Sequence, residues 1–383
     1  MDKPTVQDIF HRFYPAYLDQ YSPSPVQAKV AHNIMNCKTG AYGANVCVCE
    51  DCGFVQIHYN SCRNRCCPMC QAVPKEMWMD ARREDVLDAP YFHLVFTVPD
   101  ILNPVIYSNQ RLLYDALYHA ASSTISELTA DPKHLGAKVG YICILHTWGS
   151  EMNFHPHIHT ILLGGGLASN NQWKDNGENF FLPIRVISKM FRGKYLEELK
   201  RLWEEDKLVF HGTAEKFRNH YTFKELLDSC YGMDWIPHCK KTFNGAQTVI
   251  KYLGKYTHRI AVSNHRIVRM DDDTVTFLVK DYRNEGQWKE LTISGVEFVR
   301  RFLMHVPPRR FVRIRHYGLL CSRTKSQKLT ICRNLLGCKK YLSKLRDMEM
   351  PEILEHLYGI KICVCKACGG HLGKPQMRMP LRC

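Results

Sequence analysis

Apolar and polar residues follow two rhythms along the chain, and these predict an alternation of strands and helices. Runs rich in β-branched and aromatic residues predict strands at 91–98, 140–148 and 155–163, the last ended by the glycine triplet 164–166. Two alternating runs around an Asn-Glu-Gly turn predict a hairpin from 274–279 and 287–293. A period of about 3.6 predicts helices over 73–89, 102–128, 187–208, 246–261 and 295–303. Because both kinds of element are mixed, we expect an α+β fold.

Changes in composition predict four parts of the chain. Residues 1–36 carry two short helical patterns. Residues 37–72 are rich in cysteines and turn residues and too polar to form a core, so we expect a metal ion to hold this part together. Residues 73–265 contain three predicted strands and four of the five predicted helices, and residues 266–383 form a basic C-terminal region.

Positive charge is concentrated near the C-terminal end. The formal net charge is +15, and between Glu297 and Arg346 there are 14 lysines or arginines and one acidic residue, which gives this segment +13. Such a segment, interleaved with aromatic residues, suits phosphate neutralisation and stacking on unpaired bases. We therefore expect a nucleic-acid partner; the alternative is a solvated basic face.

The chain has 18 cysteines and no pattern of an exported or membrane protein. It lacks a run of roughly 18 to 20 apolar residues and a basic-then-apolar leader, so we expect a cytoplasmic protein without a membrane partner. In a reducing compartment, cysteines clustered at ligand spacing indicate metal binding better than disulfides.

Two Cys-x2-Cys pairs predict a structural zinc site in the N-terminal part. Cys49 and Cys52 form the first pair and Cys67 and Cys70 the second, at the spacing of a four-cysteine zinc ribbon. Four thiolates would leave no position for water, so we expect a structural zinc ion. Two further cysteines of the stretch are candidate ligands, so a different ligand set or a second ion stays open: Cys62 and Cys66.

Another Cys-x2-Cys pair lies near the C-terminus. Cys365 and Cys368 have Cys363 and His371 beside them. The pair predicts a second zinc site, closed by Cys383 or by a residue remote in the sequence.

Three alternating histidines predict a second kind of metal site. On a strand, His157 and His159 point to one face, and His155 can join them. Two imidazoles on one face can chelate a divalent ion, and a site completed by oxygen ligands tolerates Mg²⁺ or Mn²⁺, which polarise phosphates. Surface histidines without a metal are the alternative.

A pair of tyrosines lies within the predicted helix 246–261. Tyr252 and Tyr256 are four residues apart and share a helix face, and a basic set surrounds them: Lys251, Lys255 and Arg259. Such a pair usually packs, but beside a metal site a phenol can attack a phosphodiester and form a covalent phosphotyrosine without ATP.

With these motifs the sequence resembles the HUH-class rolling-circle insertion-sequence transposases, of the insertion sequence ninety-one type with an N-terminal zinc-binding domain. Five segments carry the resemblance in the family's order: YNSCRNRCCPMCQ at 59–71, FTVP at 96–99, HPHIH at 155–159 with GGG at 164–166, YLGKY at 252–256 and RIRHYG at 313–318. Cys66 departs from the family, in which a histidine is expected, and this leaves the zinc ligand set open.

The resemblance implies the fold, the activity and the roles of the residues. The fold would be an HUH endonuclease-like antiparallel sheet flanked by helices, with a small zinc-binding domain and a basic C-terminal region. His157 and His159 would bind a catalytic Mg²⁺ or Mn²⁺, and Tyr252 and Tyr256 would be the nucleophiles. We favour His155 as third ligand over Gln247, with two weaker candidates, Glu151 and His146.

The implied function is cleavage and rejoining of single-stranded DNA at transposon ends and in target DNA through a 5′-phosphotyrosine. Candidate DNA contacts in the basic region are Arg313 and Arg315. The sequence has no Gly-x4-Gly-Lys-Ser/Thr pattern, so a helicase or replication protein would come from the bacterial host, at the nucleoid. The alternatives are a relaxase or replication-initiator nickase, a catalytically silent zinc-stabilised DNA-binding regulator, and a zinc hydrolase.

Overall fold

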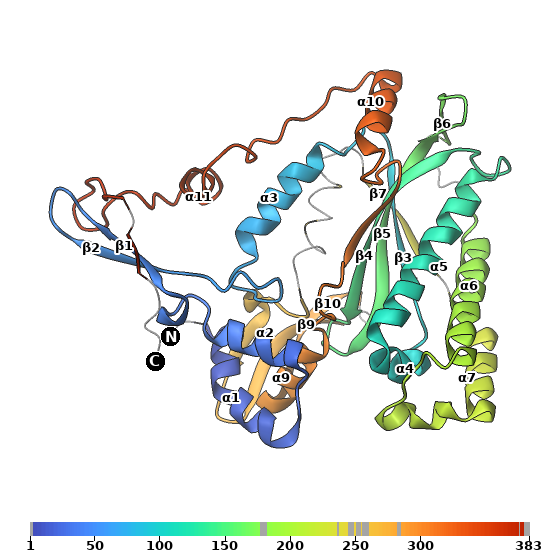
Figure 1. Cartoon of the computed structure of the whole chain (residues 1–383), viewed down its shortest axis with the longest axis horizontal. Coiled ribbons are helices and arrows are strands. Elements are labelled where there is room, and N and C mark those ends of the chain that lie inside the picture. The colour runs from blue at the N-terminus through green and yellow to red at the C-terminus, as the bar shows by residue number, and fades with distance from the viewer. Residues whose placement is uncertain are drawn as a thin grey trace.

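A computed structural model describes most of the chain. The described residues are 3–176, 182–235, 237–243, 249, 254, 260–281, 285–374 and 376–378. Among them no helix is long and apolar enough to cross a membrane. The predicted α+β class is confirmed: antiparallel sheets pack against helices (Figure 1).

The largest sheet is antiparallel and has six strands. Its order is β11-β4-β5-β3-β7, with β6 paired to β5. The strands span Tyr91–Thr97 (β3), Lys138–Trp148 (β4), Phe154–Leu167 (β5), Trp173–Asp175 (β6), His238–Phe243 (β7) and Ile314–Gly318 (β11). β4 and β5 are buried almost along their whole length, because both faces of the sheet are covered.

The glycine triplet lies inside β5, so the prediction that it ends the strand is wrong. A Cβ atom on Gly164 would lie 2.9 Å from the carbonyl oxygen of Pro90, and one on Gly166 would lie 2.6 Å from that of Lys138. Glycine therefore allows the neighbouring backbone to approach, and the strand continues to Leu167.

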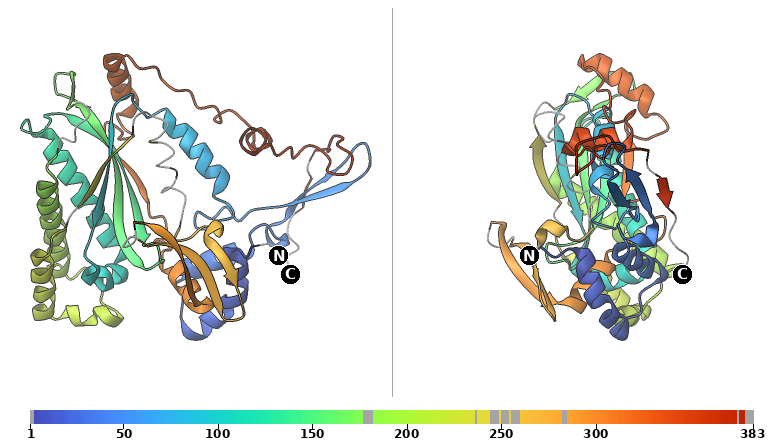
Figure 2. Two further views of the ribbon diagram at one scale, coloured as in Figure 1. Left: turned by 180° about the vertical axis from the view of Figure 1, so that it is seen from behind. Right: turned by 90° about the vertical axis from the view of Figure 1, so that its left-hand side faces the viewer.

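Helices cover one face of this sheet. They span Asn103–Ser108 (α4), Gln110–Ala130 (α5), Ile184–Glu204 (α6) and His220–Gly232 (α7), and they lie together on one side (Figure 2). The predicted helix 102–128 is divided at Asn109, whose side chain bonds to the carbonyl oxygens of Val105 and Val209. Strand residues of one parity, such as Tyr141, Cys143 and Leu145, join this core.

Residues of the opposite parity face a second core. Ile142 and Ile144 of β4 and Ile161 and Leu163 of β5 pack there. Helices α3 (Ala72–Arg83) and α10 (Lys325–Leu336) contribute to it, and so does Val249. The strand period of two thus assigns alternate side chains to two different cores.

The first residues share a core with a segment far along the chain. Helices α1 (Val6–Gln20) and α2 (Pro25–Met35) pack with α9 (Gly295–Met304) and a three-stranded sheet: β8 (Ile267–Met270), β9 (Thr274–Asp281) and β10 (Gln287–Ser294). β9 and β10 form the predicted hairpin. This packing crosses the predicted limits at 36 and 266, so the first and last parts are not separate in space.

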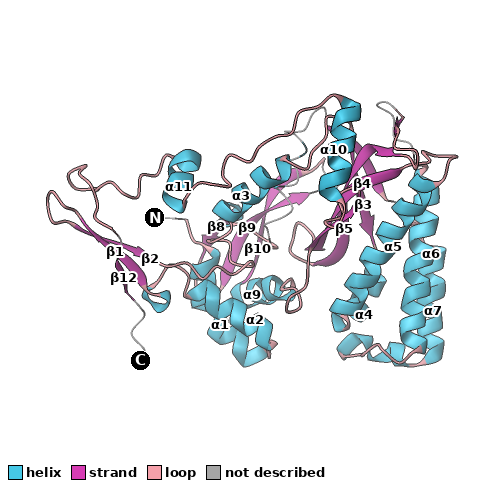
Figure 3. Ribbon diagram, turned by 45° about the horizontal axis from the view of Figure 1, so that its top comes forward, coloured by secondary structure: helices cyan, strands magenta, loops and turns pink. Residues whose placement is uncertain are grey.

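A third small sheet also joins the two ends of the chain. β1 (Ala44–Val48) pairs with β2 (Val55–Tyr59) on one side and with β12 (Gln376–Arg378) on the other. Figure 3 shows the three strands side by side. Helix α11 (Met350–Tyr358) lies in the segment of the chain that leads from α10 to β12.

Candidate functional site

Three histidines from two adjacent strands meet on the face of the large sheet that α3 covers. His146 lies on β4, directly opposite His157 of β5, and His159 follows two residues later on the same face. Their ring nitrogens all lie within 4.8 Å of one another. The Nε2 atoms of His157 and His159 are 3.1 Å apart. The register of β4 and β5 therefore builds the cluster.

Burial favours the neutral imidazoles of His157 and His159. All three side chains belong to the buried polar residues. Burial, and then the charge of His155, lowers the pKa of His157 to about 4, while burial and the neighbouring His146 and His157 lower the pKa of His159 well below its usual value. Neutral rings offer lone pairs at neutral pH, as a metal site requires.

The hydrogen bond of His157 leaves one of its nitrogens for a ligand. Nδ1 lies 2.7 Å from the carbonyl oxygen of His155 and donates to it, which makes Nε2 the acceptor nitrogen. This Nε2 faces that of His159. When the His159 proton lies on Nδ1, 2.9 Å from Nε2 of His93, both Nε2 atoms offer lone pairs 3.1 Å apart, so the donor set fits a divalent metal ion.

The structure brings His146, the weaker candidate, to the histidine pair. His155, the favoured third ligand, is not in the cluster; its Nδ1 lies 3.2 Å from Oδ1 of Asp100 at the surface. Glu151 lies outside the cluster as well, where its carbonyl oxygen accepts from Arg301. Gln247 lies outside the described residues. His146 comes from another strand, so its proximity depends on register.

His93 is a site residue that the sequence analysis missed. It lies on β3, is 4% exposed, and its Nε2 is 2.9 Å from Nδ1 of His159. The two rings are stacked with centroids 5.1 Å apart. Its only signal in the sequence is a single histidine within an apolar strand, which is usually a core residue.

The predicted nucleophiles Tyr252 and Tyr256 lie outside the described residues, as do Lys251, Lys255 and Arg259. Two residues of the same segment are described, and both lie near α3. Val249 is buried in the core beneath that helix. Gly254 is buried so closely that an added Cβ would lie 2.0 Å from Sδ of Met79.

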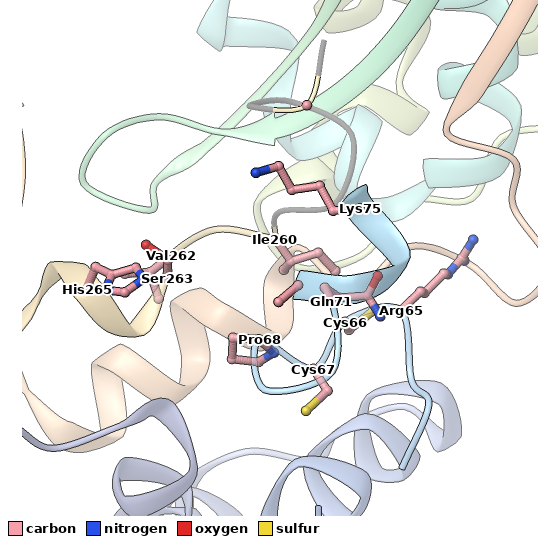
Figure 4. Close-up of a pocket in the computed structure, with 12 residues that line it drawn as sticks. Arg65, Cys66, Cys67, Pro68, Gln71, Lys75, Ile260, Val262, Ser263 and His265 are labelled. Carbon is pink, nitrogen blue, oxygen red and sulfur yellow. The ribbon is translucent and has the colours of Figure 1, made fainter. Parts of the chain in front are cut away.

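A pocket of about 230 Å³ adjoins this segment. Figure 4 shows it between the start of α3 and residues 260–265. Arg65 and Lys75 are the cationic residues that line it, and Gly254 and His265 line it as well. Its size and charge suit an anionic group such as a backbone phosphate.

Six of the eight cysteines between residues 37 and 70 belong to two groups. Four thiols gather before α3: Cys37, Cys62, Cys67 and Cys70. Sγ of Cys70 lies 3.3 Å from Sγ of Cys37 and 3.5 Å from that of Cys62. Donation from the Cys62 and Cys67 thiols lowers the pKa of Cys70, so a thiolate is favoured there. Such a four-thiol group supports structural zinc.

The predicted grouping of the first two Cys-x2-Cys pairs is wrong. Cys49 and Cys52 lie with Cys365 and Cys368 instead of with Cys67 and Cys70. Cys67 and Cys70 lie with Cys62, which was a predicted candidate, and with Cys37, which was not predicted. A Cys-x2-Cys turn fixes two neighbouring thiols, but tertiary packing decides which pairs meet.

Three other candidates are not members of the ion sites. Cys66 is buried outside both cysteine groups, and burial raises the pKa of its thiol. Arg315 bonds to Asp115 and lies 3.9 Å above the ring of Tyr118, and burial lowers the pKa of Arg313. Both arginines thus pack within the protein, and their contact with DNA stays a prediction.

Comparison with known proteins gives matches along most of the chain. A family model described as a putative transposase matches residues 140–328, and one described as a transposase zinc-binding domain matches residues 9–98. The putative transposase y4qJ of Sinorhizobium fredii is 40% identical over 95% of this chain and 93% of its own length. The transposase for insertion sequence element IS801 of Pseudomonas savastanoi pv. phaseolicola is 30% identical over 79% of this chain and 72% of its own.

One solved structure is also similar, the conjugative relaxase TrwC in complex with OriT DNA. It is 15% identical and covers 45% of this chain and 68% of its own, with a TM-score of 0.23.

Proposed function

Because the chain belongs to the family of insertion-sequence transposases with an N-terminal zinc-binding domain, we propose that it cleaves and rejoins single-stranded DNA at its element's ends. The reaction would proceed through a covalent 5′-phosphotyrosine. One observation carries the proposal. Three buried histidines converge on the sheet face against which Val249, three residues before Tyr252, is packed.

The histidines would hold the divalent ion, Mg²⁺ or Mn²⁺, that this chemistry needs. His157 and His159 offer ring nitrogens, and His146 is the third proposed ligand. A bound ion would draw charge from the scissile phosphate and make the phosphorus easier to attack. Imidazole ligands favour Mn²⁺ over Mg²⁺, since Mg²⁺ prefers oxygen ligands.

The tyrosines would exchange one phosphodiester for another. The phenol oxygen of Tyr252 or Tyr256 forms a bond to phosphorus and gives up its proton to solvent. The bond from phosphorus to the 3′ oxygen breaks, and that oxygen takes up a proton to become a free hydroxyl. The number of phosphodiester bonds is unchanged, so no ATP is needed, and the second tyrosine can accept the other DNA end.

Basic side chains would hold the strand in line for this attack. Arg65 and Lys75 line the pocket next to Gly254, which lies between the two tyrosines in the sequence. The charge of +13 between Glu297 and Arg346 extends the cationic character of the protein. Separation of the strands would fall to a helicase of the host.

The test is a covalent adduct on a denaturing gel. We would incubate labelled single strands from the element's ends with the protein in Mn²⁺, Mg²⁺ or EDTA. A metal-dependent adduct is expected, abolished in Tyr252→Phe or Tyr256→Phe and strongly reduced in His157→Ala. Tyr221→Phe is a matched control, because that ring is 77% exposed and lies on α7. Binding without an adduct on any end would instead support a silent DNA-binding regulator.

A further inference from the structure

Two Cys-x2-Cys turns from opposite ends of the chain face each other beside the small sheet. One contains Cys49 and Cys52 and the other Cys365 and Cys368, and all four Sγ atoms lie within 4.8 Å of one another. The match to the zinc-binding domain model ends at residue 98 and so includes only the first turn.

The two turns have the same backbone geometry. In the first, the Cys49 N–H donates to the oxygen of Phe54 and the Gly53 N–H donates to that of Cys49. In the second, Cys365 donates to Gly370 and Gly369 donates to Cys365, at identical spacing. Each turn has a glycine after its second cysteine, with φ of 70° at Gly53 and 77° at Gly369, values that favour glycine.

The second turn also holds its sulfur atoms by backbone hydrogen bonds. In the second turn, the backbone N–H of Ala367 donates to Sγ of Cys365 at 3.3 Å and that of Gly370 donates to Sγ of Cys368 at 3.4 Å. Donation from backbone N–H groups to sulfur stabilises thiolates. In the second turn, backbone N–H groups thus hold both sulfur atoms beside the thiols of the first turn.

The distances between the sulfur atoms match a tetrahedral ion. Sγ of Cys49 lies 3.5 Å from that of Cys368, and Sγ of Cys52 lies 3.8 Å from that of Cys365. With Zn–S bonds of about 2.3 Å, the edge of a tetrahedron is about 3.8 Å. A disulfide would require about 2.05 Å. The spacing thus fits four separate thiolates around one ion.

We propose that Cys49, Cys52, Cys365 and Cys368 bind a zinc ion, separate from the one assigned to the Cys37 group, and that this ion joins the two ends of the chain. This inference does not depend on the DNA chemistry. A zinc ion here gives the C-terminal segment a role in the N-terminal zinc-binding domain.

The surrounding packing is too small to hold the turns together without an ion. The buried cluster at this point consists of Leu372 and three cysteines: Cys47, Cys49 and Cys365. Three side chains on β2 are instead about half exposed: Val55, Ile57 and Tyr59. A sheet with so little core depends on a metal for its stability.

The ion would fix the far end of a long connection. Residues 337–374, here called the strap, lead from α10 past α11 to the second turn (Figure 1). Near its start the strap is anchored on α3. Asp80 accepts from the hydroxyl groups of Tyr341 and Ser343 at 2.6 Å and from the backbone N–H of Leu345 at 2.9 Å. The zinc ion is the second anchor and adds to the backbone hydrogen bonds of Glu50 to His371 and of Gly373 to Val48, so its loss loosens the strap beyond α11.

The experiment counts zinc in the full-length protein and in single variants. Each protein is purified under reducing conditions, and zinc and iron per chain are measured by mass spectrometry. Cys368→Ser removes one ligand, and Cys363→Ser is the matched control, because Cys363 is exposed, close in sequence and outside the group. We expect Cys368→Ser to contain one zinc less than Cys363→Ser.

Limited proteolysis provides the second measurement. We expect cleavage between residues 359 and 374 to be at least tenfold faster in Cys368→Ser than in Cys363→Ser. Equal zinc content in the two variants, iron in place of zinc, or a Cys49–Cys368 disulfide in the wild type would overturn the proposal.

If Cys368→Ser does not fold, the His157→Ala variant decides the question. It lacks one of the histidines that could retain zinc but keeps both cysteine groups. Two zinc ions per chain support the proposal, and a single zinc ion refutes it.

Discussion

Replacement of His93 tests whether the histidine cluster is a metal site. The neutral ring of His159 can bind an ion through Nε2 only if its proton is on Nδ1. That N–H needs an acceptor in the buried site, and Nε2 of His93 lies 2.9 Å away. His93→Phe keeps an aromatic ring but removes the acceptor. His93→Gln keeps an acceptor oxygen and is the matched control.

The expected loss follows from the unsatisfied N–H group. A buried donor without a partner costs about 1–3 kcal/mol, and loss of such an outer partner lowers metal affinity by about 10–100-fold, equivalent to about 1.4–2.7 kcal/mol. We expect the Kd for Mn²⁺ to rise by this factor in His93→Phe and by less than threefold in His93→Gln.

Calorimetric titration with Mn²⁺ and the Mn²⁺ dependence of adduct formation measure this effect. In His93→Phe, the adduct should form at near wild-type rate once Mn²⁺ is raised in proportion to its Kd. An unchanged Kd in a folded His93→Phe protein would refute the positioning role of His93. A loss of the adduct that excess Mn²⁺ cannot restore would show that His93 acts in another way.

Three further predictions concern the packing around the site. Gly254→Ala should lower stability by about 1–3 kcal/mol and slow adduct formation, because its Cβ collides with Met79, and adding Met79→Ala should restore the rate. Asp80→Asn should cost about 1–3 kcal/mol in urea unfolding, since a charged acceptor of three strap hydrogen bonds is lost; unchanged stability would contradict this anchor. Burial lowers the pKa of His305 to about 4, so the folded state favours the neutral ring. This preference contributes about 3 kcal/mol to the free energy of unfolding, in full above pH 6.5, and the contribution should be lost as the pH falls to 4. In His305→Gln, this decrease in the free energy of unfolding between pH 6.5 and 4 should be absent.

The sequence alone determined the local elements and the chemical types of the site. Runs of β-branched and aromatic residues predicted β3 and β4, and alternation of apolar and polar residues predicted the hairpin of β9 and β10, because both signals are local in the sequence. The same alternation placed His157 and His159 on one face. Cys-x2-Cys spacing predicted metal-binding turns, since both ligands lie in one short loop. The motifs also indicated the family that the comparisons confirm.

Only the tertiary structure decided which remote residues meet. His146 joins His157 through the register of β4 on β5, and a shift of one residue would turn it to the other face. His93 approaches His159 from a third strand. Neither neighbour has a sequence signal, because strand order and register depend on the packing of both faces of the sheet.

The cysteine groups show the same limit. Cys49 and Cys52 have the same spacing as Cys67 and Cys70, so a sequence pattern cannot tell which pair each will meet. The fold decides it, because β1 pairs with β12 and thereby carries the turn with Cys365 and Cys368 to the N-terminal hairpin. Contacts across more than 300 residues depend on the free energy of the whole fold, which no local pattern contains.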